Sequence, residues 1–219
     1  MSYIAERRQE EKDRRRNEII DAAEALYREV GWDAVTMDAV ARRARLSRAL
    51  VYVYFQDKTD LHFAIAIRAI DELTRRFAEA ADGARTGAEK MLAIGHAYIE
   101  FGEALPHYFD ACARLELHTP GDAAPTPQEQ LLYETQRRPH EAVVRALEAG
   151  QRDGSIRKDL GDLNVTARVL WGFSHGLIQI VMTKREVLGR AGIDTAQLTD
   201  QALALLTFAL TGGKPDRSP

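Results

Sequence analysis

The sequence has one cysteine, no long apolar run and almost no net charge. A single cysteine, Cys112, excludes an internal disulfide and a multi-cysteine metal cluster, and it fits a reducing compartment. The most apolar stretch, Val169 to Met182, is shorter than the about 20 apolar residues that a bilayer span needs. Residues 1–16 are highly charged and lack the apolar core of a secretory signal. We therefore expect a soluble cytoplasmic protein with no membrane partner.

The composition is that of an ordinary globular protein. Of the 219 residues, 45% are hydrophobic and 29% are charged, and the net charge is -3. Fibrous, low-complexity and strongly cationic coating proteins are excluded, although a local basic face is not. The length predicts one large or two small domains.

Apolar residues recur at helical spacing along the whole chain, which predicts an all-α fold. A first helix ends near Val30, followed by Gly31 as a stop. Thr36 and Ser47 are N-cap residues for two short helices, the first turning near Arg45, and Asp57 caps a longer helix from Lys58. No strand-like alternation lies between these segments.

The second half of the chain is also helical. Pro106 is expected to break or kink a helix, since proline lacks the amide hydrogen of an interior helical bond. Further expected features are a helix to about Leu117, a surface loop over 118–127, a long helix over 128–151 with a kink or restart at Pro139 and an end at Gly150 and Gly154, and two last helices over 163–184 and 196–210.

The last two predicted helices are apolar on more than one face. A helix of this kind has two surfaces to bury, one inside the subunit and one elsewhere. A second subunit is the simplest partner, and a purely internal three-layer packing is the alternative. Gly172 and Gly176, four residues apart, would allow another helix to approach closely.

Residues 36–56 carry a local charge of +3 in a slightly acidic chain. The charge comes from Arg42, Arg43, Arg45 and Arg48, opposed by Asp38 alone. Two short capped helices joined by a tight turn form a helix-turn-helix, whose second helix enters the major groove of DNA. A solvated charged face is the alternative interpretation, but the caps, the spacing and the interleaved tyrosines favour DNA.

The same segment resembles the DNA-binding domain of TetR-family regulators. The matching stretches are Ile19-Ile20-Asp21-Ala22-Ala23, Leu26-Tyr27, Gly31-Trp32, Thr36 to Ala41, Leu46-Ser47-Arg48, Tyr52 to Lys58, and Leu61. The resemblance implies an all-helical homodimer, with a three-helix N-terminal DNA-binding domain and a C-terminal helical bundle that binds an effector and dimerises through its last two helices. The expected division is an extension over 1–13, the helix-turn-helix domain over 14–62, a connecting helix over 63–80, the effector and dimerisation domain over 81–211, and a disordered tail over 212–219.

The resemblance also implies the residues that contact DNA. They are Thr36, Ser47, Arg48, Ala49, Tyr52, Tyr54 and Lys58; Arg45, for a phosphate or guanine, and Leu50, for a thymine methyl group, are further candidates at positions that depart from the family pattern. Helix N-termini, hydroxyl groups and cationic side chains position a protein on phosphates. Arg14 or Arg15 is a further candidate for the minor groove or backbone, within an extension that otherwise reads as a solvated helix.

Three positions depart from the family pattern. Arg45 replaces the usual turn glycine, so it either accepts a left-handed conformation or reshapes the turn. Leu50 replaces a small polar residue and Val53 an aromatic residue or histidine. Leu50 either touches a thymine methyl group or packs locally, and local packing is the simplest interpretation of Val53.

The C-terminal half carries no sequence signature of an enzyme or a metal site. Its histidines are scattered over separate segments, so we expect no metal and no cofactor. The resemblance implies a mainly apolar effector pocket. The candidate residues are His96, Phe101, Phe109, Cys112, Tyr133, Trp171 and His175, each of which is otherwise plain core or interface.

The sequence therefore predicts a dimeric transcriptional repressor that binds a palindromic operator and is released by a small-molecule effector. A non-specific or architectural DNA-binding protein is the first alternative, because Leu50 and Val53 are poor readers of base edges. An enzyme in the helical domain is a weaker alternative. Whether the protein represses or activates depends on where its operator lies.

Overall fold

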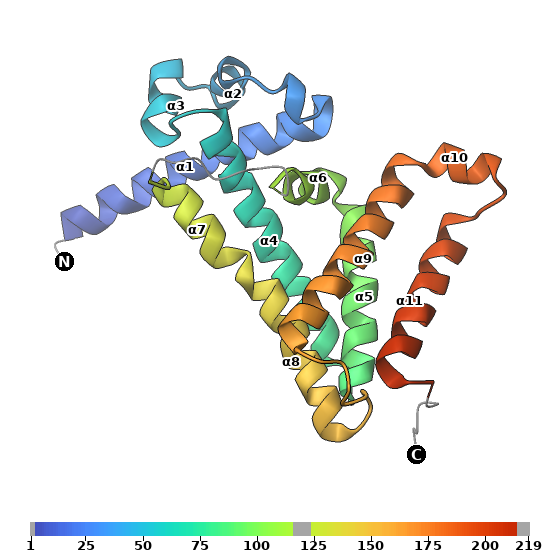
Figure 1. Ribbon diagram of the computed structural model, residues 1–219. Coiled ribbons are helices and arrows are strands. Elements are labelled where there is room, and N and C mark those ends of the chain that lie inside the picture. The colour runs from blue at the N-terminus through green and yellow to red at the C-terminus, as the bar shows by residue number, and fades with distance from the viewer. Residues whose placement is uncertain (1–2, 116–123, 214–219) are drawn as a thin grey trace. The chain divides into compact units, whose positions relative to one another are not determined.

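The computed structural model describes residues 3–115 and 124–213, and within them nearly all regular structure is α-helical (Figure 1). No strand occurs in these two ranges, so the predicted all-α fold is confirmed. The elements are α1 (Tyr3–Val30), the 3-10 turn η1 (Trp32–Ala34), α2 (Met37–Ala44), α3 (Arg48–Tyr54), α4 (Lys58–Asp82), α5 (Gly87–Ala104), α6 (Pro106–Leu115), α7 (Pro127–Thr135), α8 (Arg137–Asp153), α9 (Leu163–Thr183), α10 (Arg185–Arg190) and α11 (Thr195–Thr211).

The chain packs as two compact units. Unit 1 comprises Met1–Ala69 and His107–Glu134, and unit 2 comprises Ile70–Pro106 and Thr135–Pro219. The contacts within the chain therefore place His107–Glu134 in the same unit as the N-terminal helices. The sequence analysis instead assigned all of 81–211 to one C-terminal domain.

Unit 1 is built around the first three helices and the start of α4. Its core holds Ile19, Val40, Val51 and Leu61, each completely buried. These residues come from α1, α2, α3 and α4, so one core braces both short helices from the two longer ones. Residues 5–13 of α1 are exposed, consistent with a solvated helical extension.

Helix α6 is attached to the N-terminal helices of unit 1 through polar bonds and a buried side chain. The Tyr27 hydroxyl donates to the Asp110 carboxylate at 2.6 Å, and Arg114 forms a forked ion pair with Asp33 at 2.9 and 3.2 Å. Ala111 of α6 is fully buried in the same core. These partners are more than 80 residues apart in the chain, so sequence periodicity alone could not assign α6 to this unit.

Helices are interrupted at or near both prolines for which the sequence predicted an interruption. Pro106 separates α5 from α6, and it is the first residue of α6, where its missing amide hydrogen costs nothing. The long helix predicted over 128–151 is split at Gln136, just before Pro139. The prediction that Gly150 ends this helix is wrong. Gly150 lies inside α8, and Gly154 takes the left-handed C-cap conformation at φ 80°.

Unit 2 packs α5 against α8, α9 and α11. Gly87 and Gly150 lie where α5 and α8 touch, because a Cβ atom at Gly87 would come within 2.0 Å of the Gly150 nitrogen. A short helix that the sequence analysis missed, α10, connects α9 and α11. By contrast, a Cβ atom at Gly172 or Gly176 would meet no described residue within 4 Å, so these glycines serve no close packing within 3–115 and 124–213.

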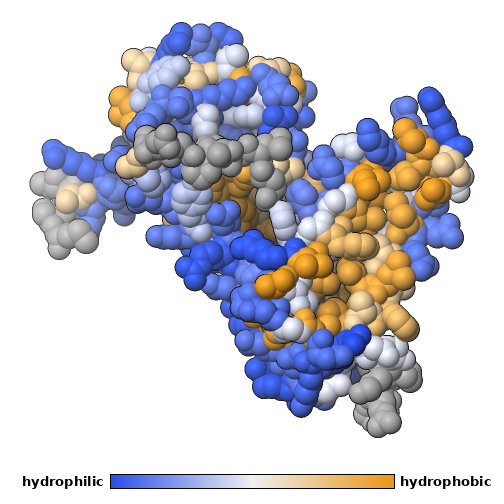
Figure 2. All heavy atoms as spheres, in the orientation of Figure 1, coloured by the Kyte–Doolittle hydropathy of each residue, from blue (hydrophilic) through white to orange (hydrophobic). Residues whose placement is uncertain are grey.

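One face of α9 and α11 is apolar and exposed. Figure 2 shows these apolar side chains gathered over the two helices. The exposed apolar residues of this face are Val165, Val169, Phe173 and Ile180 on α9, and Leu205 and Phe208 on α11. The prediction that these helices are apolar beyond the face they bury inside the subunit is confirmed.

None of the helices in 3–115 and 124–213 combines the length and hydropathy of a membrane span. The loop predicted over 118–127 and the tail predicted over 212–219 lie mostly outside the described residues. Of the parts that are described, Pro127 at the end of the predicted loop is the first residue of α7. Gly212 at the start of the predicted tail is the C-cap of α11, with φ 69°.

Candidate nucleic-acid interface

The helix-turn-helix is held by two side-chain caps. The Thr36 hydroxyl oxygen accepts from the Ala39 amide at 3.1 Å and starts α2, and the Ser47 oxygen accepts from the Leu50 amide at 3.2 Å and starts α3. Each bond satisfies an amide that has no partner inside its helix. Both caps are local, which is why the sequence predicted both helix starts correctly.

Arg45 ends α2 in the left-handed conformation, with φ 56° and ψ 38°. The Leu46 amide donates to the Ala41 carbonyl oxygen at 2.9 Å, which closes the helix end. Of the two outcomes that the sequence left open, Arg45 accepts the left-handed conformation and the tight turn survives. Among the described residues it is the only non-glycine with positive φ.

Replacing Arg45 with glycine should stabilise the protein. The left-handed conformation costs an L-residue about 1–2 kcal/mol, partly offset by the larger entropy loss of glycine, so we expect Arg45→Gly to raise the free energy of unfolding by about 0.5–1 kcal/mol. The Arg45 side chain is exposed, so little packing is lost. Thermal melting measured beside Arg45→Ala is the test. Alanine removes the same side chain but keeps the strain, so equal melting temperatures for the two variants would contradict this explanation.

The outward face of α3 consists of four residues. Arg48, Ala49, Tyr52 and Val53 are exposed, whereas Val51 is completely buried. Val53 is 75% exposed, so the expectation that it packs locally is wrong. Leu50 is half-buried and is therefore a weaker candidate for a base contact than Val53.

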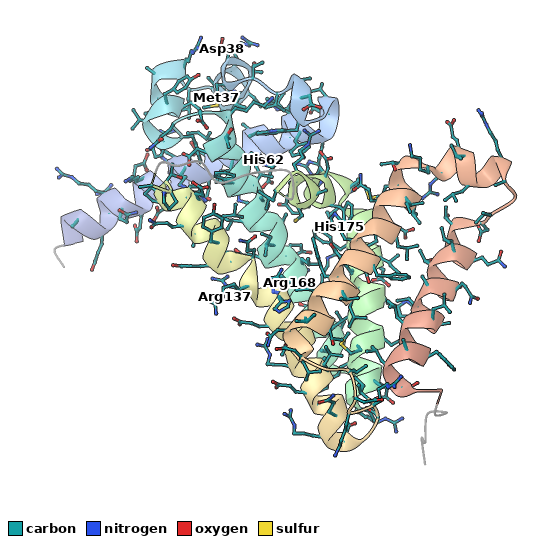
Figure 3. The ribbon with its side chains drawn as sticks, viewed as in Figure 1. Met37, Asp38, His62, Arg137, Arg168 and His175 are labelled. Atoms are coloured by element: carbon teal, nitrogen blue, oxygen red, sulfur yellow. The ribbon has the colours of Figure 1, made fainter. Side chains whose placement is uncertain are left out.

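Arg48 is held in place by groups on two helices. Its Nε and Nη1 atoms pair with the Asp38 carboxylate of α2 at 3.1 and 3.2 Å, and its guanidinium lies 5.5 Å from the Tyr52 ring centroid. Figure 3 labels Asp38 at the outer edge of α2. Tyr52 and Asp38 together thus fix the orientation of the guanidinium and raise the pKa of Arg48.

Lys58 and Tyr54 lie further from the open face. The Lys58 ammonium donates to the Asp33 carbonyl oxygen at 3.2 Å and lies 5.0 Å from the Trp32 ring centroid. Burial lowers the pKa of Lys58, and the negative charge of Asp33 offsets part of this decrease. Tyr54 is half-buried against the core of unit 1. Both residues therefore lie at the edge of the motif and not on the exposed face of α3.

The sequence analysis did not include two residues of this surface, Asp38 and Val53, among the candidate DNA-binding residues. Asp38 entered only as a charge that reduced the basic total, and Val53 only as a packing residue. The i, i+4 spacing places Val53 on the same helical face as Ala49, but it does not tell whether that face is exposed. The Asp38–Arg48 pair had no sequence signal, because it depends on the geometry of the turn.

Two of the predicted effector residues meet in unit 2. The Trp171 and His175 ring centroids are 5.3 Å apart, and the Tyr98 hydroxyl lies 2.8 Å from His175 Nδ1. Burial lowers the pKa of His175, which favours its neutral imidazole. Phe77 packs edge-on against Tyr98 at 5.8 Å. Tyr98 and Phe77 were not among the sequence candidates.

The remaining candidates are divided between the two units. In unit 2, Phe101 is fully buried and His96 is exposed. His96 lines an open groove of about 480 Å³ between α5 and α11, whose other lining residues include Leu92, Leu203 and Phe208. Phe109, Cys112 and Tyr133 belong to unit 1, where the Tyr133 hydroxyl donates to Glu129 at 2.7 Å. Among the described residues, no three His, Cys, Asp or Glu side chains are grouped to hold a metal ion.

Two protein-family models match the chain. "Bacterial regulatory proteins, tetR family" matches residues 19–65, and "Tetracyclin repressor-like, C-terminal domain" matches residues 91–208. The first range contains the helix-turn-helix, and the second contains most of unit 2. The two matches do not overlap, and the second alone covers more than half of the chain.

Curated relatives are similar over part of their length. The chain is 28% identical over 92 residues to the HTH-type transcriptional activator FasR of Mycolicibacterium smegmatis, covering 42% of each protein. It is 33% identical over 82 residues to the HTH-type nicotine-responsive transcriptional repressor HdnoR of Paenarthrobacter nicotinovorans, covering 37% of this chain and 40% of that one. The chain thus spans about two-fifths of the length of these relatives.

Solved structures share the fold over nearly the whole chain. A protein of unknown function from Rhodococcus sp. RHA1 aligns with a TM-score of 0.73 and 22% identity, covering 90% of this chain and 95% of that one. The transcriptional regulator FadR of Bacillus subtilis, solved in complex with stearoyl-CoA, aligns with a TM-score of 0.66 and 19% identity over 88% and 98%. These likenesses concern the fold.

Proposed function

The chain belongs to the TetR family of helix-turn-helix transcriptional regulators, and from this premise we propose that it is a dimeric repressor, released from a palindromic operator by a small-molecule effector. The observation that carries the DNA-binding part is the exposed face of α3, which two side-chain caps and a shared core hold in place. Arg48, Ala49, Tyr52 and Val53 would face the base edges. Thr36, Ser47, Arg45, Tyr54 and Lys58 would contact the backbone.

The exposed apolar face of α9 and α11 supports the dimer. Side chains such as Val169 and Phe208, 65% and 66% exposed, would be covered by the same face of a second copy. The two recognition helices must then lie about 34–36 Å apart to enter successive major grooves. An effector that binds better to another spacing lowers operator affinity by its differential binding energy.

We place the effector's polar contacts near Tyr98, Trp171 and His175. His175, whose pKa is lowered by burial, and its hydroxyl partner Tyr98 suit an apolar molecule with an uncharged polar group. Phe101 and His96 are further candidates in the same unit. Phe109, Cys112 and Tyr133 stay candidates from the sequence alone.

The test is selection of bound duplexes from a random pool at physiological salt, with the mass of the free protein measured in parallel. We expect an inverted repeat bound by a dimer. A protein that enriches no sequence and whose binding falls steeply with salt would be the architectural alternative. Enrichment of a single, unrepeated site by a monomer would also overturn the proposal.

Activation is the second candidate, because FasR is named as an activator. The two are separated by deleting the gene and measuring transcripts next to the selected operators. Repression predicts that they rise, and activation predicts that they fall.

Arg48 should set the preference for one base pair. A guanidinium held by a carboxylate presents its remaining donors in a fixed fork, which suits the O6 and N7 acceptors of guanine. We expect Arg48→Lys to lose about tenfold of the discrimination at one position, and Asp38→Asn to lose part of it while binding to random duplex becomes tighter. Titration of single-base-substituted operators measures both effects.

Arg43→Lys is the matched control for this prediction. It breaks a similar forked pair, with Glu29 at 2.6 Å on both arms, away from α3. It should leave every base preference unchanged. If Arg48→Lys and Arg43→Lys have the same effect, Arg48 acts as a general cation and reads no base.

A further inference from the structure

We propose that Val53, together with Ala49, reads thymine through its 5-methyl group, so that each half-site requires thymine at a defined position. This inference rests on the proposed operator binding. It deepens that proposal by naming the chemical group that the apolar part of α3 recognises.

The outward face of α3 is divided into two stripes. Arg48 and Tyr52, four residues apart, form a polar stripe in which the guanidinium lies 5.5 Å from the ring centroid. Ala49 and Val53 form a parallel stripe that presents only methyl groups. Residues four apart on a helix share a face, so both stripes point outward together.

Burial separates Val53 from the two other branched aliphatic residues of the helix, Leu50 and Val51. Val53 is 75% exposed, Val51 is completely buried and Leu50 is half-buried. A single exposed valine is ordinary on a protein surface. Val53 differs because it lies on the exposed face of the second motif helix, beside Arg48 and within the segment that carries the +3 charge.

The chemistry of the major groove then limits what Val53 can read. A valine side chain neither donates nor accepts a hydrogen bond, so it cannot distinguish the polar edges of the bases. Thymine alone presents a methyl group in this groove. Ala49 and Val53 are about 6 Å apart along the helix axis, against about 3.4 Å per base step, so their contacts fall within one or two neighbouring steps.

The decisive probe is deoxyuridine, which pairs as thymidine does and lacks only the methyl group. In the selected operator, each thymidine is replaced in turn, first in one half-site and then in both, and affinity is measured by fluorescence anisotropy. We expect one replacement to weaken binding about fourfold, the value of one buried methyl group, and the symmetric replacement to weaken it about sixteenfold.

Two variants connect the effect to Val53. In Val53→Ala, the loss at that thymidine should fall to less than about twofold. Val30→Ala is the matched control, because Val30 is also an exposed valine of unit 1 but lies at the end of α1. It should keep the full loss. Both changes affect exposed side chains, and circular dichroism verifies that both variants are folded.

Three results would overturn the inference. If deoxyuridine is neutral at every position of a specific inverted repeat, this inference fails while the proposed function stands. If the loss persists unchanged in Val53→Ala, another residue such as Leu50 reads the methyl group. If no specific operator is found, the proposed function fails and this inference fails with it.

Discussion

The Val169→Glu variant should be a folded monomer that binds the operator more than a hundredfold more weakly than the parent protein. Val169 is 65% exposed on α9, so its replacement removes little packing within the chain. In a dimer, the same position would bury a carboxylate without a partner, which disfavours association strongly. Gel filtration should therefore show one chain of 24.5 kDa instead of two.

The loss of operator affinity follows from the loss of linkage between half-sites. A dimer that has bound one half-site holds its second recognition helix at high effective concentration over the other, and such linkage raises affinity by about 10²–10⁴. A monomer retains the contacts of α3 with a single half-site and loses this gain. Leu205→Glu, which changes the same face on α11, should give the same result.

Val187→Glu is the matched control for the dimer prediction. Val187 is a similarly exposed valine, but it lies on α10, outside the α9 and α11 face. It should remain dimeric with unchanged operator affinity. If Val169→Glu and Leu205→Glu both remain dimeric as well, the subunits meet at another surface and the apolar face has a different role.

The parts of the fold that the sequence predicted correctly are encoded locally. The caps by Thr36 and Ser47 act on amides three residues away, and Pro106 acts at its own position. The break before Pro139 is also local. Such features depend only on neighbouring residues, so periodicity and residue type are enough to predict them.

The parts that could not be predicted depend on contacts between distant residues. Arg48 and Asp38 meet only because Arg45 completes a tight turn, and α6 joins unit 1 through partners that lie far back in the chain. Periodicity also could not rank Leu50 against Val53. The rotation of α3 about its own axis decides which one is exposed, and the core residue Val51 sets that rotation.

The glycines show the same limit. Gly172 and Gly176 have a spacing that suggests close helix packing, yet none of the residues that the structure describes approaches the position of a Cβ atom at either glycine. The close approach instead occurs between Gly87 and Gly150, which are far apart in sequence and follow no motif. Only the three-dimensional structure identifies this pair.

We expect Gly87→Ala to destabilise the protein by about 3 kcal/mol or more, at the upper end of the cost of overpacking a core. The added Cβ atom would lie 2.0 and 2.2 Å from the backbone nitrogen and Cα of Gly150. Backbone atoms of α8 cannot rotate away as a side chain can, so α5 must separate from α8. That movement would also stretch the bond from the Gly87 amide to the Asp153 carboxylate, which is 2.7 Å long.

The melting temperature measures this effect. For a chain of this size, a loss of about 3 kcal/mol lowers it by roughly 6–12 °C. Gly83→Ala is the matched control, because Gly83 lies just after α4, has open space around it and has no positive φ. Its melting temperature should stay the same or rise slightly. A Gly87→Ala variant as stable as Gly83→Ala would show that α5 and α8 do not meet backbone to backbone.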